Sequence, residues 1–474
     1  MTLTNILIFA ALILAYRLIL RERWRGWLLF GVSVIAVYWL QPALPIRGLD
    51  FWLPTATLAL VVFGWAATAP QEDRRTRENW VTAVALLALV LLIATTRYLS
   101  LTGLLTPSRP PQTVSVLVVL AIIALIGWLL VRFTRPVSAG LTAFIVVIIL
   151  VFLALKIPQV TQPLSALFRS LAGQSVERAS AIDIRWLGFS YVAFRLIATL
   201  RDRQTGRLPS ITLREYITYL IFFPALTAGP IDRPERFLKD LRGSHPPSAS
   251  EFLIGGQRLA VGLFKKFVVA DALALLALSS ANADKIQTAG WLWVAVAAYS
   301  LLIYFDFSGY TDIAIGLARW LGIALPENFN HPYLKPNLTQ FWNNWHMTLT
   351  QWFRAYFFNP LTRALRSAPR PVSVVWVILI TQVSTFLLIG LWHGGTPNFL
   401  FWGLWHGLGQ FIQNRYSDFM KPRITGLDNR PTLKRVLSIA GTVLTFIYVT
   451  LGWVWFALPT TGQALQVFTR LFGG

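Results

Sequence analysis

Long apolar runs alternate with short polar segments along almost the whole chain. Runs of about 17 to 25 residues recur, each long enough for a helix to cross the roughly 30 Å hydrocarbon layer of a bilayer. Backbone polar groups in lipid must be satisfied within the segment, and barrel strands are shorter and alternate in polarity, so these runs predict helices. The runs expected to cross are 3–20, 27–46, 51–68, 80–96, 114–131, 139–157, 183–200, 253–278, 291–305, 374–392, 398–410 and 436–458.

The pattern therefore predicts an all-α, polytopic integral membrane protein with about 11 to 12 transmembrane helices. We expect three parts: N-terminal transmembrane helices over 1–182, a core over 183–413, and a C-terminal loop with the last transmembrane helix over 414–474. The first run lacks a basic start and a small-residue cleavage site, which favours a retained span over a signal peptide.

Two segments of the core depart from simple spans. The run 216–228 is short, contains Pro224 and ends at Gly229-Pro230, which is typical of a re-entrant hairpin. The basic residues Arg233 and Arg236 follow it. Over 337–356, aromatic and apolar residues recur at helical spacing opposite polar ones, which predicts an amphipathic helix at the interface or around a cavity.

Composition agrees with a membrane protein and narrows its partners. The chain is 55% hydrophobic and 13% charged, yet its net charge is +22. Because the basic residues lie in short loops beside the spans, they are expected to set topology and to meet anionic lipid head groups, and nucleic acid is not an expected partner. The loops at Arg21, Arg74 and Arg132 are predicted to be cytoplasmic, with the N-terminus outside. An acidic ligand such as a carrier protein is the alternative explanation of the charge.

Candidate chemistry is concentrated between residues 341 and 410. The chain has five histidines, and His346, His393 and His406 each follow a tryptophan in this stretch. A histidine in an apolar segment is costly unless it is paired or lines a wet cavity, so it is a functional-site hypothesis. His346 and His393 flank one hydrophobic span, which can place both rings along one passage through the bilayer.

A histidine that titrates near neutral pH can take the proton of a hydroxyl as its oxygen attacks an activated acyl group. Asn343, Asn398 and the indole N–H groups are candidate hydrogen-bond donors to the developing oxyanion. A lone Trp-His pair can also be an interfacial anchor, and His406 can be either a supporting partner or a buried ring. His331 and His245 are interpreted as turn and loop residues.

Other kinds of site are weakly indicated. Asp306 and Asp312 could bind a cation with Ser308, but a hard cation needs six or more oxygens, so structural carboxylates are favoured. Three distant Trp-His pairs are a poor zinc site. The absence of cysteine excludes thiolate chemistry on this chain. We find no P-loop, dinucleotide-binding glycine pattern or nucleophile elbow.

Several separated blocks between residues 222 and 407 form a distinctive set. They are Phe222-Phe223-Pro224 to Gly229-Pro230-Ile231-Asp232-Arg233, Asp306-Phe307-Ser308-Gly309-Tyr310, Pro326-Glu327-Asn328-Phe329-Asn330, Phe341-Trp342 to Trp345-His346, Trp352-Phe353-Arg354, Leu391-Trp392-His393-Gly394, Trp402-Gly403 and His406-Gly407. Together these blocks resemble the membrane-bound O-acyltransferase family, in its bacterial branch that modifies cell-envelope polymers. The resemblance covers roughly 183–410 in the family's order. It departs at Asn343-Asn344, where many relatives are basic.

The resemblance implies a ring of helices around a tunnel, with an acyl thioester entering from the cytoplasm and a hydroxyl acceptor from outside. It maps the family's essential histidine onto His393 and its second histidine onto His346. Trp342, Trp345, Asn343, Asn398 and His406 are then expected near the substrates, and Arg233 and Arg236 near the donor's carrier. Within the branch, D-alanyl transferases of teichoic acids and alginate-type O-acetyltransferases match about equally.

The expected function is therefore O-acyl transfer in the cytoplasmic membrane of a bacterium. The donor is a thioester on a carrier-protein phosphopantetheine or on coenzyme A, no cofactor or metal is bound permanently, and accessory envelope proteins are possible partners. The alternative is a transporter or flippase that uses the same histidines as a proton relay.

Overall fold

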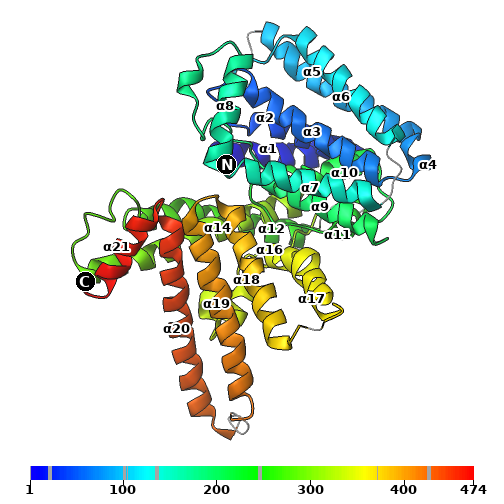
Figure 1. Cartoon of the computed structure of the whole chain (residues 1–474). Helices are drawn as coiled ribbons and strands as arrows, with labels where there is room; N and C mark the ends of the chain where they lie inside the picture. Colours follow the sequence, from blue (N-terminus) through cyan, green and yellow to red (C-terminus); the bar gives the residue numbers. More distant parts are fainter. Residues whose placement is uncertain are drawn as a thin grey trace. The chain divides into compact units, whose positions relative to one another are not determined.

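The computed structural model describes residues 2–19, 24–99, 103, 105–133, 138–243, 248–370, 372–423 and 429–474. Every regular element in these ranges is a helix (Figure 1), which confirms the all-α prediction. His245 and the basic residues Arg21, Arg23 and Arg135 lie outside the described residues, and the side chain of Arg132 is likewise not described.

The chain divides into two compact units. Unit 1 contains Met1–Leu259 and Ile313–Leu325, and unit 2 contains Ala260–Asp312 and Pro326–Gly474. The division falls inside α12 and inside α14.

Unit 1 holds several apolar helices together with several short connecting ones. Its elements are α1 (Leu3–Ile19), α2 (Arg25–Trp39), α3 (Leu49–Thr68), α4 (Gln71–Arg74), α5 (Arg77–Thr95), η2 (Thr96–Tyr98), α6 (Thr113–Phe133), α7 (Ser138–Ala154), α8 (Pro158–Leu171), η3 (Val176–Arg178), α9 (Phe189–Gln204), α10 (Leu213–Leu220), η4 (Phe223–Ala225), α11 (Pro234–Arg242) and the first part of α12 (Ala249–Phe264).

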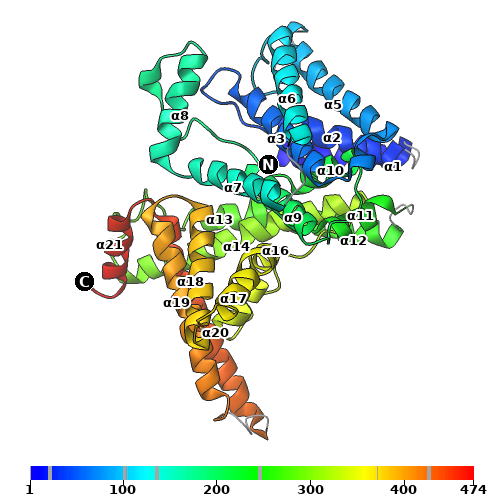
Figure 2. The same cartoon turned by 45° about the vertical axis from the view of Figure 1, so that its right-hand side comes forward.

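Unit 2 contains a long helical hairpin and a group of short helices beside it. Its elements are the π-helix η5 (Lys265–Ala270), α13 (Asp271–Ala274), most of α14 (Ala289–Trp320), η6 (Pro332–Leu334), α15 (Leu338–Asn344), α16 (Met347–Phe353), the π-helix η7 (Arg354–Phe358), α17 (Asn359–Arg366), α18 (Val374–His393), α19 (Pro397–Met420), α20 (Pro431–Ala457) and α21 (Thr461–Leu471). Helices α18, α19 and α20 lie side by side in both views (Figure 1 and Figure 2).

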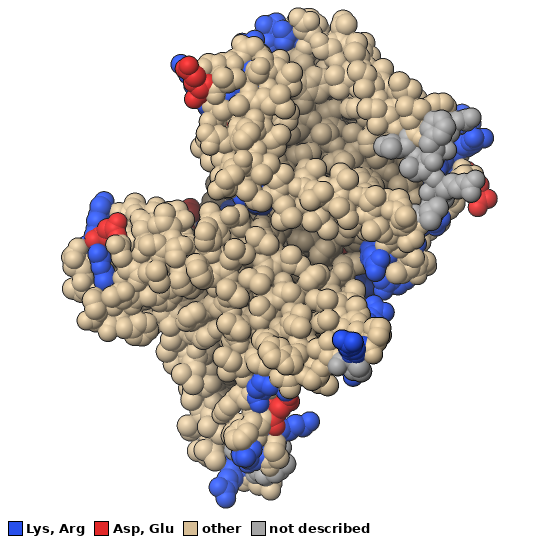
Figure 3. Space-filling model, in the orientation of Figure 1, with Lys and Arg blue, Asp and Glu red and all other residues tan. Residues whose placement is uncertain are grey.

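Five helices of the described chain are long and apolar enough to cross a membrane. They are Leu49–Thr68, Arg77–Tyr98, Ala289–Trp320, Val374–His393 and Pro431–Ala457. The bent pair Ser138–Ala154 and Pro158–Leu171 would make a sixth, and Leu3–Tyr16, Arg25–Trp39 and Thr113–Leu129 are shorter apolar helices. On the face drawn in Figure 3, charged side chains gather in a few places with broad areas of other residues between them, which agrees with the apolar character of these helices.

The count is lower than the sequence predicts because some apolar runs fold as shorter or broken helices. In the run 183–200 the helix starts only at Phe189, and it buries Arg195, whose guanidinium donates to the carbonyls of Leu220 and Ala225 at 3.0 and 2.9 Å. A charged side chain that satisfies buried carbonyls belongs in the interior of a protein, not against lipid. The run 253–278 is interrupted by the π-helix Lys265–Ala270 and ends its helix at Ala274.

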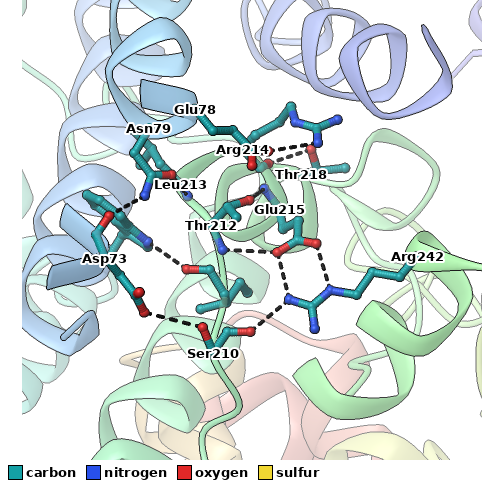
Figure 4. A network of polar contacts seen from close by, with 12 residues as sticks. Asp73, Glu78, Asn79, Ser210, Thr212, Leu213, Arg214, Glu215, Thr218 and Arg242 are labelled. Carbon is teal, nitrogen blue, oxygen red and sulfur yellow. Dashed lines mark hydrogen bonds and ion pairs between the residues drawn. The ribbon is translucent and has the colours of Figure 1, made fainter. Parts of the chain in front are cut away.

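The short run 216–228 forms α10 and then a 3₁₀ turn that contains Pro224. Its side chains from 216 to 226 are buried. The polar contacts in Figure 4 hold the start of α10 within unit 1: Thr212 and Glu215 form a capping box, and Leu213 N donates to Asn79 Oδ1 of α5 at 2.8 Å. Arg242 of α11 donates to both carboxylate oxygens of Glu215 at 2.7 and 2.8 Å.

Replacing Glu215 by glutamine is expected to lower the free energy of unfolding by about 1 kcal/mol at pH 7, a value reduced because Arg242 is half exposed. Burial alone would raise the pKa of Glu215, but the hydrogen bonds and charge of Arg242 outweigh it and hold this pKa below its ordinary value of 4.5. The stabilisation is thus present above pH 4.5 and is lost as the pH falls through the lower folded-state pKa.

Thermal unfolding of the purified protein at pH 7 and at pH 3 measures this contribution. The wild type should lose more stability on acidification than Glu215→Gln does. Glu235→Gln, at an exposed position of α11, is the matched control and should resemble the wild type. If the thermal stability of Glu215→Gln and of the wild type fell equally between pH 7 and pH 3, the stabilising role of the Glu215–Arg242 pair would be contradicted.

Candidate active site

The hairpin of α18 and α19 positions His393. The two helices approach to backbone contact: a Cβ at Gly390 would lie 2.2 Å from the carbonyl oxygen of Phe399, and one at Gly403 would lie 2.7 Å from that of Phe386. Small residues allow such close packing of membrane helices. His393 is the last residue of α18, directly before the turn that leads to Pro397, so this packing fixes where its imidazole lies.

A sharp corner between α15 and α16 positions His346. The residue adopts the left-handed conformation, with φ 42° and ψ 55°, which is uncommon for a residue other than glycine. Asn328 holds the corner, because its carbonyl accepts from Met347 N at 2.9 Å and its side chain accepts from Thr348 Oγ1 at 2.6 Å. The exposed turn residue His331 shares this conformation, so the strain alone does not mark a site. What distinguishes His346 is its burial.

His346 and His393 line the same cavity, which lies entirely within unit 2 and has a volume of about 290 Å³. Trp392 lies beside both rings, with its centroid 6.2 Å from that of His346 and 4.3 Å from that of His393. Phe307 packs edge-on against His346 at 4.6 Å, and Phe456 against His393 at 4.7 Å. The structure thus brings together the two histidines that the sequence places 47 residues apart (393 − 346).

One face of α18 forms a long wall of the cavity. The lining residues of this helix are Gln382, Thr385, Phe386, Ile389, Trp392 and His393. They recur every three or four residues, as one helical face does. From Gln382 to His393 the helix rises about 16 Å at 1.5 Å per residue. The cavity is therefore elongated, with the histidines toward one end of this stripe and Gln382 at the other.

Several buried polar atoms of the cavity wall have no hydrogen-bond partner within the described part of the chain. They are His346 Nε2, Trp342 Nε1, Trp402 Nε1, Gln382 Oε1 and Gln410 Oε1. A buried donor or acceptor left unpaired costs about 1–3 kcal/mol, so these atoms are available to hydrogen-bond a bound molecule. The wall offers donors near the histidines and amide acceptors further along α18 and α19.

Arg354 and Asn343 are exposed residues of the cavity wall, where it reaches the surface of unit 2. A guanidinium N–H of Arg354 donates to Asn343 Oδ1 at 2.7 Å. Arg354 begins a π-helix, a local irregularity that is frequent at functional sites. Among the lining residues of this described cavity, Arg354 is the one lysine or arginine.

The other predicted site residues lie in different places. Trp342 and Trp345 line the cavity, as Asn343 does. Asn398 does not: its amide donates to the Leu458 carbonyl at 2.7 Å and accepts from Thr461 Oγ1 at 2.8 Å, which ties α19 to the end of α20 and the start of α21. His406 is fully buried behind Trp342 and Trp402, with ring centroids 4.8 and 4.9 Å away.

Arg233 and Arg236 belong to unit 1. Arg236 pairs with Asp232 at 2.8 Å, and the backbone N–H of Arg233 donates to the same carboxylate oxygen at 2.7 Å. Burial raises the pKa of Asp232, against the opposing effect of Arg236. Both arginine side chains remain exposed.

The carboxylates of α14 are engaged in ion pairs with the π-helix Lys265–Ala270. Asp312 accepts from Lys265 Nζ at 2.7 Å, and Asp306 pairs with Lys266. In the ranges that the structure describes, no three His, Cys, Asp or Glu side chains are grouped to hold a metal ion. These contacts favour the structural interpretation of Asp306 and Asp312 over a cation site.

Sequence reasoning did not assign Gln382, Gln410 or Arg354 to the site. Gln382 carried a usable signal, since it is a polar side chain in the middle of an apolar run and such residues usually face the protein interior. Gln410 and Arg354 lie at the ends of their predicted helical segments, where polar residues are common. Only the fold brings them to the cavity.

Comparison with known proteins places most of the chain in one family model, that of the membrane-bound O-acyltransferases, which matches residues 73–451. The chain is 33% identical over 287 residues to the probable alginate O-acetylase AlgI of Pseudomonas aeruginosa, covering 60% of this chain and 51% of that protein. It is 31% identical over 280 residues to the teichoic acid D-alanyltransferase of Bacillus subtilis, covering 58% and 69%.

A third relative is the peptidoglycan O-acetyltransferase of Helicobacter pylori, which is 31% identical over 263 residues and covers 55% of this chain and 46% of that protein. The chain thus spans about half the length of several relatives it matches, including AlgI.

Proposed function

The chain belongs to the membrane-bound O-acyltransferase family, and we propose that it transfers an acyl group from a thioester to a hydroxyl of a cell-envelope polymer. The acyl group is D-alanyl or acetyl, the thioester arrives from the cytoplasm, and the polymer lies outside the cytoplasmic membrane of a bacterium. The relatives named for modifying alginate, teichoic acid and peptidoglycan support this class of acceptor.

One observation carries the proposal: His346 and His393 line one cavity, and the ring of Trp392 lies beside both of them. If the two substrates meet between these rings, one imidazole can act as a base on the acceptor side and the other can assist on the donor side. The transfer needs this arrangement. A cavity about 16 Å long along α18 suits a donor and an acceptor that enter from different ends.

In the proposed step, His393 takes the proton of the acceptor hydroxyl as its oxygen attacks the thioester carbonyl carbon. The new C–O bond forms, the C–S bond breaks, and the sulphur leaves as a thiol once it is protonated. The oxyanion that develops on the carbonyl needs aligned donors, and the unpaired indole N–H groups of Trp342 and Trp402 are suited to this. His346 assists on the donor side, and Trp345 completes the wall beside it. Asn398 and His406 act indirectly, by holding this wall in place.

The far end of the cavity suits the arm of a phosphopantetheine thioester. Such an arm has about 13 bonds from phosphorus to sulphur, or about 16 Å when extended, which equals the rise from Gln382 to His393. The unpaired amide oxygens of Gln382 and Gln410 can accept from its two amide N–H groups. Arg354, held by Asn343, can pair with its phosphate. Arg354 would thus supply the positive charge that this chain lacks at Asn343-Asn344.

The donor's carrier is proposed to be a small acidic protein, or the donor is acyl-coenzyme A. Arg233 and Arg236 are exposed and basic, which suits contact with an acidic carrier. No permanently bound cofactor takes part in the proposed step, and nucleic acid has no role in it. Accessory envelope proteins and membrane lipids are further proposed partners.

A thiol-release assay tests the proposal against the transporter alternative. Purified protein is given an acetyl or D-alanyl thioester, on coenzyme A or on a phosphopantetheine-bearing carrier, with and without a polymer acceptor. An acyltransferase is expected to liberate the thiol in proportion to ester formed on the polymer. A transporter would move the polymer or a lipid intermediate and release no thiol, and that result with all four donors would overturn the proposal.

A further inference from the structure

Unit 1 contains a second concave site, separate in sequence from every residue proposed for acyl transfer. It has a volume of about 360 Å³ and lies where the end of α7 meets the segment that precedes α9. Its walls are mainly apolar, from Pro42, Phe152, Leu155, Leu187 and Phe189, and two cationic side chains, Lys156 and Arg185, line it as well.

The wall that carries Arg185 is held rigidly. The buried side chain of Gln41 donates to the Arg185 carbonyl at 2.7 Å and accepts from Leu187 N at 3.1 Å. Trp186 donates from its indole to Thr57 Oγ1 at 2.7 Å and stacks on Phe189 with centroids 4.3 Å apart. Gly188 has φ +69°, and a Cβ there would lie 2.9 Å from the Leu226 carbonyl oxygen. These contacts therefore hold the backbone of this wall in place.

The two positive charges have no counter-ion in the described part of the chain. Neither Lys156 nor Arg185 has a carboxylate partner among these residues. Asp183, the acid closest in sequence to Arg185, is already used: it accepts from Arg169 at 2.8 Å and from Ser165 at 2.7 Å. Lys156 is half-buried and Arg185 is exposed, and both line this mainly apolar recess, so two cations without a carboxylate partner favour binding of an anion there.

The position of the site in the fold indicates where that anion comes from. Helices α7 and α8 are together long and apolar enough to form one membrane span, but they are bent by 90° at the break that contains Lys156. If α7 crosses the bilayer, α8 runs along its surface, so the break lies at the level of the head groups. Lipid phosphates are concentrated at that level, and a recess whose apolar walls also carry two cationic side chains matches a phospholipid, in which phosphate and acyl chains are adjacent.

We propose that Lys156 and Arg185 form a binding site for the phosphate of one anionic phospholipid, whose acyl chains lie against Phe152 and Leu155. A lipid without net charge carries its own cation beside the phosphate and gains less from two further positive charges. The bound lipid stabilises unit 1 at the α7–α8 bend. This inference does not depend on the acyltransferase proposal.

The test is thermal unfolding of the full chain in detergent, with phosphatidylglycerol, phosphatidylcholine or inorganic phosphate added. Phosphatidylglycerol is expected to raise the wild-type midpoint by about 3–5 °C, because a ligand that binds only the folded state stabilises it. The Lys156→Ala/Arg185→Ala variant should lose this shift. The variant Arg430→Ala/Arg435→Ala removes the same charge at exposed positions of unit 2 and should keep it.

Native mass spectrometry gives a second readout, in which the wild type retains one more phosphatidylglycerol than the double variant. If that variant does not fold, Lys156→Gln and Arg185→Gln are compared singly, and Arg185→Lys should retain binding. If phosphatidylglycerol raised the thermal midpoint of the wild type and of the double variant equally, the assignment of Lys156 and Arg185 as the binding site would be overturned. A shift with inorganic phosphate as large as that with lipid would overturn the lipid as its ligand, as would an equal response to phosphatidylcholine.

Discussion

Replacing His393 by alanine is expected to lower the rate of acyl transfer by about 10²–10⁴-fold or more while the protein remains inserted and folded. The imidazole lines the cavity and has aromatic neighbours on several sides, so its loss removes the proposed base without breaking a backbone contact. The measurement is ester formation on the polymer acceptor, together with thiol release from the donor, at saturating concentrations of both substrates.

The matched control is His331→Asn. His331 is exposed, does not line the cavity and adopts the same left-handed backbone that asparagine tolerates. It should keep wild-type activity. His346→Asn tests the second imidazole with the same backbone tolerance, and it should lower activity without abolishing folding. Full activity of His393→Ala with the wild-type amount of folded protein would refute its assignment as the base.

Gly390→Ala is expected to lower the free energy of unfolding by about 3 kcal/mol or more, a larger loss than Glu215→Gln causes, and to abolish acyl transfer. The new methyl group would lie 2.2 Å from the Phe399 carbonyl oxygen, and a backbone atom cannot move aside as a side chain can. The hairpin of α18 and α19 must open to relieve the clash. Because His393 is three residues further along α18, the opening displaces it from the cavity.

The measurements are the thermal midpoint and the yield of monodisperse protein in detergent, followed by the activity of the folded fraction. Gly31→Ala is the control, since a Cβ at Gly31 meets nothing within 4 Å and alanine favours the interior of α2. That variant should be as stable as the wild type or slightly more so. A Gly390→Ala protein that unfolds at the wild-type temperature would show that the hairpin does not depend on backbone contact.

Helix class and membrane location could be predicted from the sequence because they depend on local properties. The length and apolarity of a run decide whether it can span a bilayer, and no distant contact changes this. For α18 and α20 the predicted runs 374–392 and 436–458 agree with the observed Val374–His393 and Pro431–Ala457. The prediction of 183–200 as a span was wrong in detail, because hydrophobicity does not reveal that Arg195 reaches buried carbonyls 25 to 35 residues away.

The candidate site was predictable in part for the same reason. A histidine in an apolar segment is unusual in itself, so His346 and His393 could be singled out from residue type and surroundings alone. Asn398 has the same local appearance and nevertheless turns to Leu458 and Thr461. Whether a polar side chain faces a cavity or ties two helices together depends on which helix packs beside it, and a single sequence does not contain that information.

Residue order alone was thus sufficient to establish that the chain is helical and membrane-embedded and that Trp-His pairs are its most unusual chemistry. Those properties follow from the transfer energies of individual side chains and from the helical period. Packing in three dimensions established that His346 and His393 share one cavity, that Gln382, Gln410 and Arg354 join them, and that Asn398 and His406 do not line it. These outcomes depend on the close approach of α18 and α19 and on the corner at His346, because only contacts between distant segments set the distance between side chains.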